Sequence, residues 1–131
     1  MIGRGKERLA LKTCLVVDDS RVIRKVARRI LEELGFDVAE AADGADALSF
    51  CRTSMPEAIL LDWHMPVMSG PEFLRRLRLE PGGEAPRVIY CSGESQIPRI
   101  REALESGADE FIIKPFDTGI MVGKLTSAGL A

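Results

Sequence analysis

Short apolar runs alternate with longer stretches of mixed character along this chain, and that alternation is the strongest limit on its fold. The runs suit strands that are buried on both faces of a parallel sheet. They cover residues 13–17, 36–41, 58–61, 88–91 and 111–113. Helical patterns follow them over residues 21–34, 45–52, 71–79, 97–105 and 118–127. This order predicts an α/β fold: a five-stranded parallel sheet with helices on both faces, joined by right-handed crossovers.

Composition indicates an ordinary globular protein with one domain. The 131 residues are 46% hydrophobic and 29% charged, which is enough for one substantial core. The net charge of −2 offers no basic surface for nucleic acid. No apolar run approaches the roughly 20 residues that cross a bilayer, so we expect no membrane insertion. Residues 1–12 lack the apolar segment of a signal peptide, and we expect a flexible lead-in there and a domain over residues 13–131.

The cysteines argue against a disulfide framework, and the single histidine argues against a zinc site. Cys14, Cys51 and Cys91 are odd in number and widely spaced, and two of them lie within apolar runs. This pattern is typical of reduced, buried thiols in a cytoplasmic protein. Trp63, the only tryptophan, is expected to be a half-exposed loop residue, and its place beside Asp62 makes it a fluorescence reporter for that site.

The predicted helix 21–34 is amphipathic, with apolar residues spaced by three and four positions. These are Val22, Ile23, Val26, Ile30, Leu31 and Leu34. Its basic residues are Arg21, Arg24, Lys25, Arg28 and Arg29. They have two interpretations, a solvated helix surface or a docking surface for an acidic kinase partner. Ser20 or Asp19 can cap this helix, and Gly35 suits its C-terminal end.

Polar residues follow four of the five predicted strands. They are Asp18-Asp19, Asp62, Ser92 and Lys114. Because the carboxyl ends of parallel strands meet at one edge of the sheet, we expect these side chains to converge. Three neighbouring carboxylates repel one another, which raises at least one pKa. A divalent cation relieves that repulsion, and oxygen ligands in a compact site favour Mg²⁺.

This set of residues has the parts that phosphoryl transfer to a carboxylate requires. Asp62 is the candidate nucleophile, while the Ser92 hydroxyl and the Lys114 ammonium can bind phosphoryl oxygens. A hydrolase of small phosphate esters would use the same chemistry, but it needs a substrate pocket and a separate general acid. The sequence shows no insertion that would enclose such a pocket. A binding module with a degenerate site is a further alternative, which the intact acidic residues disfavour.

The same residues resemble the signature of response-regulator receiver domains. Asp19, Asp62, Ser92 and Lys114 are separated by 43, 30 and 22 residues, and the resemblance covers nearly the whole chain after Lys12. It implies a doubly wound, flavodoxin-like (βα)5 domain with strand order 2-1-3-4-5. It also implies that a histidine kinase donates a phosphoryl group to Asp62 in a Mg²⁺-dependent reaction.

The resemblance implies a role for each matched residue. Asp19, Asp62 and the backbone carbonyl of His64 bind Mg²⁺, and Asp18 holds a metal-bound water. Ser92 and Phe111 form a switch pair that alters the output face, and Lys114-Pro115 is a cis peptide. Ser92 stands where Thr is commoner and Phe111 where Tyr is commoner, so a phenol hydrogen bond is lost while the switch hydroxyl is kept. Gly93 replaces the usual Ala.

The position of His64, two residues after Asp62, influences dephosphorylation in this family. The imidazole could touch an attacking water, or His64 could be a solvent-exposed turn residue that contributes only its carbonyl.

The expected output is partner binding, because the chain ends about where a receiver domain alone would end. The run 18–25, Met65-Pro66-Val67-Met68 and the C-terminal segment from Lys114 are similar to single-domain (CheY-type) chemotaxis regulators of alphaproteobacteria. We therefore expect a cytoplasmic, monomeric phosphoacceptor rather than an enzyme, with a motor, phosphatase or phosphotransfer protein as partner. The output face is expected over residues 95–106 and Phe111. The alternative is a phosphate sink or phosphorelay intermediate without a motor target.

Overall fold

The computed structural model describes residues 12–93 and 100–130, and strands and helices alternate within these ranges. The strands are β1 (Thr13–Val17), β2 (Asp37–Ala41), β3 (Ala58–Asp62), β4 (Arg87–Ser92) and β5 (Glu110–Ile113). The helices are α2 (Arg21–Glu33), α3 (Gly44–Thr53), α4 (Gly70–Leu79), α5 (Ile100–Glu105) and α6 (Thr118–Ser127). The predicted lead-in up to residue 11 and the predicted helical residues 97–99 lie outside the described residues.

The strands form one parallel sheet in the order β2-β1-β3-β4-β5, which confirms the predicted fold class and strand order. The two central strands, β1 and β3, pair directly, with Val17 beside Leu61. All five strands run in the same direction, so the residues that follow β1, β3, β4 and β5 are brought to one edge.

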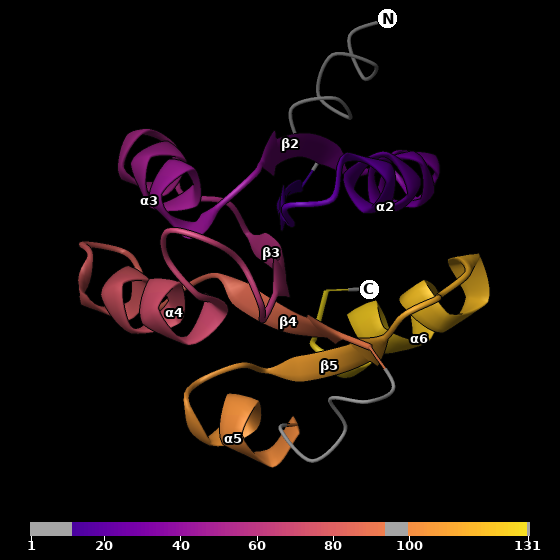
Figure 1. The fold of residues 1–131 in the computed structure, drawn as a ribbon. Coiled ribbons are helices and arrows are strands. Elements are labelled where there is room, and N and C mark those ends of the chain that lie inside the picture. The colour runs from indigo at the N-terminus through magenta and orange to yellow at the C-terminus, as the bar shows by residue number, and fades with distance from the viewer. Residues whose placement is uncertain (1–11, 94–99, 131) are drawn as a thin grey trace, which may run out of the picture.

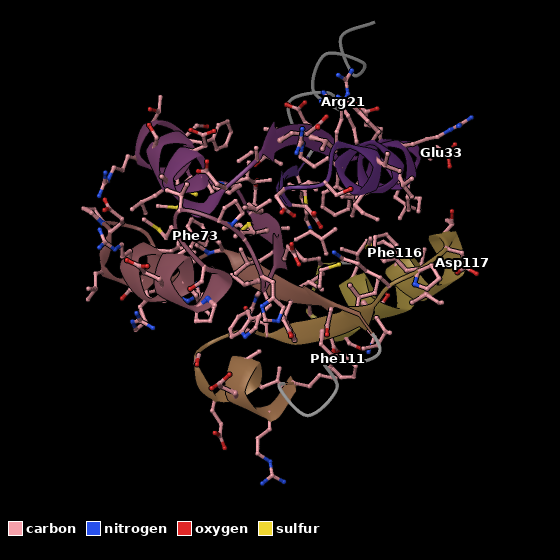
Figure 2. The ribbon with its side chains drawn as sticks, viewed as in Figure 1. Arg21, Glu33, Phe73, Phe111, Phe116 and Asp117 are labelled. Carbon is pink, nitrogen blue, oxygen red and sulfur yellow. The ribbon has the colours of Figure 1, made fainter. Side chains whose placement is uncertain are left out.

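Alternate residues along each strand face opposite layers of helices, as the two-residue period of a strand requires. Leu15 and Ile59 pack in a cluster with residues of α3, α4 and α5. Val16 and Leu60 pack in a second cluster with residues of α2 and α6. Figure 1 shows α2 and α6 on one side of the sheet and α3 and α4 on the other. Phe73 of α4, labelled in Figure 2, is fully buried in the first cluster.

Two helices begin at caps that the sequence predicts. The Ser20 hydroxyl accepts a hydrogen bond from the Ile23 amide at 3.3 Å, at the start of α2. The Asp117 carboxylate accepts one from the Ile120 amide at 2.9 Å, at the start of α6. Gly35, just after α2, has φ of +95°, a left-handed conformation that glycine adopts without strain.

Three apolar residues lie where the sequence interpretation did not place them. Val22 and Val26 are 71% and 43% exposed, because α2 faces the sheet with a narrower stripe centred on the small, fully buried Ala27. Trp63 is buried, not half-exposed, because its ring packs edge-on against Tyr90 with centroids 4.5 Å apart.

The cysteines agree with the prediction, since Cys14, Cys51 and Cys91 are all free and buried. Burial raises the pKa of the Cys14 thiol to about 12, so this thiol is protonated at neutral pH and contributes to packing. Within residues 12–93 and 100–130, no helix combines the length and apolar character that a membrane crossing requires.

Candidate functional site

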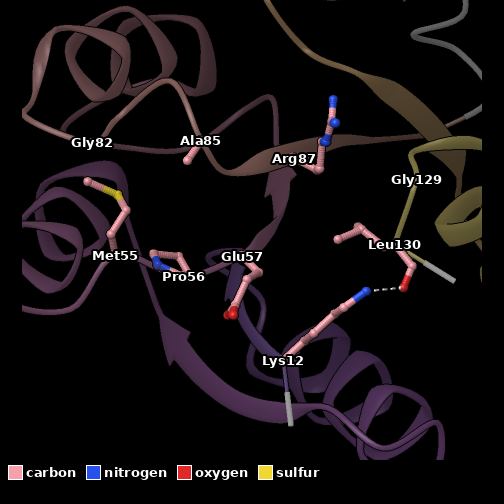
Figure 3. Close-up of a pocket in the computed structure, with 9 residues that line it drawn as sticks. All are labelled: Lys12, Met55, Pro56, Glu57, Gly82, Ala85, Arg87, Gly129 and Leu130. Atoms are coloured by element: carbon pink, nitrogen blue, oxygen red, sulfur yellow. Dashed lines mark hydrogen bonds between the residues drawn. The ribbon is translucent and has the colours of Figure 1, made fainter. Parts of the chain in front are cut away.

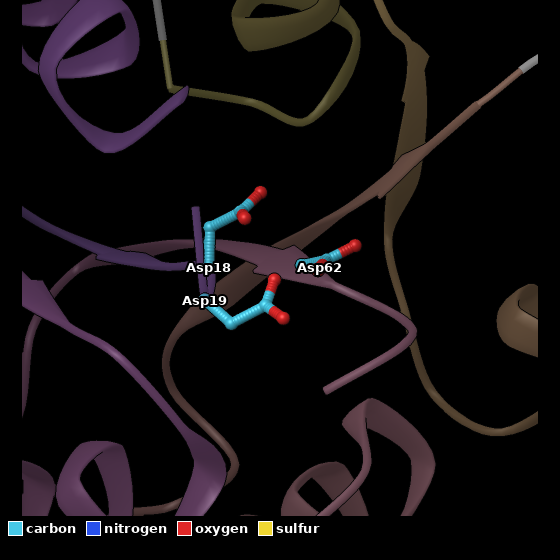
Figure 4. A group of neighbouring side chains, drawn as sticks. All are labelled: Asp18, Asp19 and Asp62. Carbon is cyan, nitrogen blue, oxygen red and sulfur yellow. The ribbon is translucent and has the colours of Figure 1, made fainter. Parts of the chain in front are cut away.

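Three aspartates meet at the carboxyl edge of the sheet. Asp18 and Asp19 follow β1, and Asp62 is the last residue of β3. Their side chains lie together in Figure 4, each with a carboxylate oxygen within 4.8 Å of the others. Asp18 and Asp62 are buried, and Asp19 is exposed. The adjacent, parallel placement of β1 and β3 therefore brings together residues that are more than 40 positions apart in the sequence.

Asp18 is held at every polar group. Its amide donates to the Ala41 carbonyl at 3.1 Å, and its carboxylate accepts hydrogen bonds from the Ser20 amide at 2.8 Å and from Lys114 at 3.0 Å. Its carbonyl accepts a hydrogen bond from the Arg24 guanidinium at 2.8 Å. The chain leaving β1 is consequently restrained from several sides.

Lys114 supplies positive charge to this group from the end of β5. Its ammonium lies 3.0 Å from an Asp18 oxygen and 3.4 Å from an Asp62 oxygen. Burial disfavours the charged ammonium, but the pKa of Lys114 is raised overall by Cys91 and by the two carboxylates. Lys114 therefore remains protonated at neutral pH. The peptide bond between Lys114 and Pro115 is cis, as the family resemblance implies.

The surroundings of Asp62 disfavour its ionised form. Burial raises its pKa, the charge of Asp18 raises it further, and Lys114 offsets only part of the effect, which leaves the pKa at about 6. At neutral pH the carboxylate is thus ionised but incompletely compensated.

The three carboxylates fit a divalent cation. They offer hard oxygen ligands on one compact patch, and together they carry more negative charge than Lys114 neutralises. Mg²⁺ accepts one or two carboxylates and keeps several waters, which the exposed side of Asp19 permits. Asp18, Asp19 and Asp62 are the residues that would hold such an ion.

Ser92 and Phe111 lie on neighbouring strands near this edge. Ser92 is buried at the end of β4, and its hydroxyl donates to the Gly93 carbonyl at 2.9 Å. Phe111 of β5 pairs in register with Tyr90 and is half-buried, and the Lys124 ammonium lies 3.8 Å from its ring centroid. The structure therefore places the two predicted switch residues on neighbouring strands, and their role as a switch stays a prediction; residues 95–99 of the predicted output face lie outside the described part of the chain.

The loop after β3 borders the acidic group. His64 is exposed there. Val67 has φ of +70° and is 82% exposed, a left-handed conformation that is unusual for a β-branched residue. Gly70, at the start of α4, allows close packing, because a Cβ there would lie 2.7 Å from the Asp62 carbonyl oxygen and 2.9 Å from Trp63 Cα.

A hollow of about 510 Å³ lies at the opposite, amino-terminal edge of the sheet. Figure 3 shows Lys12 beside it, donating a hydrogen bond to the Leu130 carbonyl at 3.0 Å. None of the predicted site residues lines this hollow. Its position separates it from the chemistry at the carboxyl edge.

Sequence reasoning missed the contribution of Arg24. Its spacing placed it with the other basic residues of α2, yet its side chain is 16% exposed and reaches the Asp18 carbonyl. The available signal was its position on the turn of α2 that follows the Asp18-Asp19 pair.

Comparison with known proteins agrees with this geometry. The family described as response regulator receiver domain matches residues 14–126. The chain is similar to the chemotaxis protein CheY of Pseudomonas aeruginosa, with 31% identity over 112 residues, 85% of this chain and 90% of that protein. It is also similar to the response regulator MprA of a Mycobacterium species, with 38% identity over 102 residues, 78% of this chain but 44% of that protein.

Solved structures show the same fold. The chemotaxis protein CheY4 of Vibrio cholerae superposes with a TM-score of 0.84 at 29% identity, covering 91% of this chain and 99% of that one. NtrX of Brucella abortus superposes with a TM-score of 0.81 at 27% identity, covering 92% of this chain and 28% of that one. Together with the family match and the converging Asp18, Asp19 and Asp62, these similarities show that the chain belongs to the response regulator receiver domain family.

Proposed function

We propose that Asp62 accepts a phosphoryl group from a histidine kinase and that the phosphorylated domain signals by binding a partner protein. The observation that carries this proposal is the position of Asp62. It is buried at the end of β3, close to two further carboxylates and 3.4 Å from Lys114. The domain acts as a cytoplasmic, monomeric phosphoacceptor that assists its own phosphorylation and dephosphorylation, rather than as an enzyme on a separate substrate.

The transfer step joins a carboxylate oxygen of Asp62 to phosphorus. The bond between phosphorus and the phosphohistidine nitrogen breaks, and its electron pair remains on that nitrogen. Lys114 lies within reach of Asp62 and can follow the developing charge on the phosphoryl oxygens. Most of the acceleration then comes from positioning and charge stabilisation.

Asp18, Asp19 and Asp62, with the predicted backbone carbonyl of His64, would hold Mg²⁺. When bound, the ion would neutralise the crowded carboxylates and withdraw charge from the phosphoryl oxygens. Asp62 needs this compensation, since its pKa of about 6 reflects burial and the neighbouring Asp18 charge.

Ser92 and Phe111 would carry the signal away from the site. The Ser92 hydroxyl now donates to the Gly93 carbonyl, and rotation toward a phosphoryl oxygen on Asp62 would break that bond. The half-buried Phe111 ring can then turn inward and change the surface around β5. This is a switch with two discrete side-chain arrangements, which phosphorylation biases.

A role in chemotaxis or motility is the leading proposal for the pathway. Its support is the similarity to the chemotaxis protein CheY of Pseudomonas aeruginosa, because the match covers 90% of that protein. The partner would be a motor component, a phosphatase or a phosphotransfer protein. The alternative is a phosphate sink or relay intermediate that shares the phosphorylation chemistry without a motor target.

The proposal is tested by Trp63 fluorescence during addition of Mg²⁺ and then acetyl phosphate. Trp63 follows Asp62 directly and is buried against Tyr90, so its emission should respond to charge changes at Asp62. We expect Mg²⁺ to alter the emission of both wild type and Asp62→Asn, at higher concentration for the variant. Acetyl phosphate should alter only the wild type.

Asp37→Asn is the matched control, because Asp37 is an exposed aspartate at the amino-terminal end of β2. It should respond to both additions as the wild type does. If the Trp63 emission of folded wild-type protein stayed unchanged and mass spectrometry found no phosphorylated species, the proposal would be wrong. A binding module would then be favoured.

The two pathways differ in phosphoryl lifetime and reversibility. A sink or relay intermediate should lose the phosphoryl group quickly and return it to a second histidine protein, whereas a motility regulator requires phosphorylation-dependent partner binding. His64→Ala should leave acceptance of the phosphoryl group intact. If that variant lost the phosphoryl group at a changed rate, the result would support contact between the imidazole and the attacking water. An unchanged rate would mean that His64 contributes only its backbone carbonyl.

A further inference from the structure

Arg24 differs from the other basic residues of α2. Its side chain is 16% exposed, whereas those of Lys25, Arg28 and Arg29 are 53%, 37% and 84% exposed. A cation that is so nearly buried requires specific partners. Arg24 is therefore poorly placed to serve as a docking charge on the helix surface.

The guanidinium of Arg24 bridges two parts of the molecule. One nitrogen donates to the backbone carbonyl of Asp18 at 2.8 Å, and another donates to the Glu40 carboxylate at 3.1 Å. Asp18 follows β1, and Glu40 lies in β2, where it pairs in register with Val16. The planar fork of arginine can serve both acceptors at once, which a lysine ammonium on its flexible stem cannot do with the same geometry.

Glu40 is a strong anchor for this bridge. Its side chain is 12% exposed, and it also accepts from Lys25 at 2.9 Å and from Arg28 at 2.7 Å. Burial alone would raise the pKa of Glu40, but Lys25, Arg28 and Arg24 lower it to about 2. The carboxylate therefore stays ionised over the whole physiological range and keeps Arg24 in place.

The peptide that Arg24 holds leads directly to Asp19. The amide and carboxylate of Asp18 have their own partners in Ala41, Ser20 and Lys114. By contrast, among the residues that the structure describes, no side chain or amide donates a hydrogen bond to the Asp19 carboxylate. The position of that carboxylate consequently depends on its backbone, and the Arg24 bond to the Asp18 carbonyl orients the peptide between the two aspartates.

We propose that Arg24 and Glu40 form a positioning pair that sets the place of Asp19 and thereby the affinity of the three aspartates for Mg²⁺. The inference rests on the proposed function and adds a residue pair outside the aspartates, serine and lysine of the site. Partners that orient metal ligands without touching the metal commonly change its affinity by 10- to 100-fold when they are altered.

The charge of Arg24 must be separated from its geometry, because removing a cation near the aspartates would by itself favour Mg²⁺ binding. Arg24→Lys keeps the charge but loses the fork. Arg24→Gln loses both. Lys25→Gln is the matched control. Like Arg24, Lys25 is a cation that contacts Glu40, but among the described residues Lys25 makes no hydrogen bond to Asp18.

The experiment is a Mg²⁺ titration of Trp63 fluorescence at a temperature where thermal unfolding shows each variant to be folded. We expect the Mg²⁺ dissociation constant to rise about tenfold for Arg24→Lys. It should rise by less for Arg24→Gln, because the lost positive charge partly offsets the lost geometry, and it should change by less than about twofold for Lys25→Gln. Glu40→Gln keeps Arg24 and its bond to Asp18 but weakens the anchor, so it should give an intermediate loss. That variant keeps the proposal testable if substitutions at Arg24 do not fold.

A second readout does not involve the metal. In metal-free protein, the carbonyl carbon resonance of Asp18 and the amide resonance of Asp19 should shift in Arg24→Lys and stay near their wild-type positions in Lys25→Gln. Wild-type Mg²⁺ affinity in folded Arg24→Lys would overturn the inference, even if its thermal stability fell. A wild type that ignores Mg²⁺ would instead overturn the proposed function, so the two failures are distinguishable.

Discussion

The two edges of the sheet differ in the arrangement of their charged side chains: opposite charges pair at one edge, and like charges lie together at the other. At the amino-terminal edge, the Arg78 guanidinium donates to the carbonyls of Gly83, Pro86 and Gly107 at 3.0, 2.9 and 2.9 Å, and to Asp109 at 3.4 Å. Asp109 in turn accepts from the Val88 amide at 2.8 Å. Charge at this edge has complementary partners and joins the loops that precede β4 and β5.

At the carboxyl edge, like charges lie together. Three carboxylates crowd within 4.8 Å, and Lys114 lies close to two of them. Asp62 has a raised pKa, and Val67 nearby has a left-handed backbone. The paired charges at the amino-terminal edge favour stability, whereas the strain and unbalanced charge at the carboxyl edge are typical of functional sites.

The largest change in stability should come from a substitution that removes the Arg78 contacts at the amino-terminal edge. Arg78→Ala removes a side chain that is 22% exposed and leaves three carbonyls without their donor. We expect the free energy of unfolding to fall by about 3–4 kcal/mol, measured by urea denaturation. The Mg²⁺ affinity of the folded variant should stay unchanged, because this edge lies at the opposite end of the strands.

Arg76→Ala is the control on the same helix. Arg76 is 54% exposed and pairs with Glu72 one turn away at 3.1 Å, so its loss should cost less than about 0.5 kcal/mol. If the two variants were equally stable, the assignment of stability to the Arg78 contacts would be wrong.

A smaller effect of opposite sign is expected at the carboxyl edge. The pKa of Asp62 is raised from 3.8 to about 6 in the folded protein, so folding favours the protonated carboxyl. The stability that this preference contributes is present below about pH 4 and is lost as the pH rises through 6. Without metal, Asp62→Asn should therefore be more stable than wild type at pH 7.5, by about 2–3 kcal/mol once solvent screening is allowed for.

The pH dependence and the metal dependence check this assignment together. The gain of Asp62→Asn should shrink as the pH falls from 7 to 4, and saturating Mg²⁺ should stabilise the wild type more than the variant. A variant that was less stable than wild type at pH 7.5 would mean that Lys114 compensates Asp62 fully, contrary to the raised pKa.

The sequence predicted the fold and the converging side chains because both depend on simple patterns. Five apolar runs and their order define the parallel sheet, and the residues that end those runs must meet at one edge. What the sequence could not supply was the direction of particular side chains. Arg24 belongs to the basic set of α2 by spacing, and only the approach of β2 brings Glu40 near it.

The spacing of apolar residues was similarly insufficient to predict which of them are buried. Val22 and Val26 fit the helical period but lie beside the stripe that faces the sheet, whose centre is the small Ala27. Trp63 follows a strand end, where an exposed loop residue is ordinary, yet the contact with Tyr90 draws it into the core. These outcomes depend on tertiary contacts, which local periodicity does not contain.

The smallest expected change in stability concerns Val67, and it tests whether the carboxyl edge holds backbone strain. Val67 holds φ of +70° while its side chain is 82% exposed, so little packing offsets the backbone strain. Asparagine tolerates this conformation better, and Val67→Asn should raise the free energy of unfolding by about 0.5–1 kcal/mol in urea denaturation. Val67→Ala retains a Cβ and should gain less. If both variants gave wild-type stability, the left-handed backbone would carry no strain, and the contrast between the two edges would rest on charge alone.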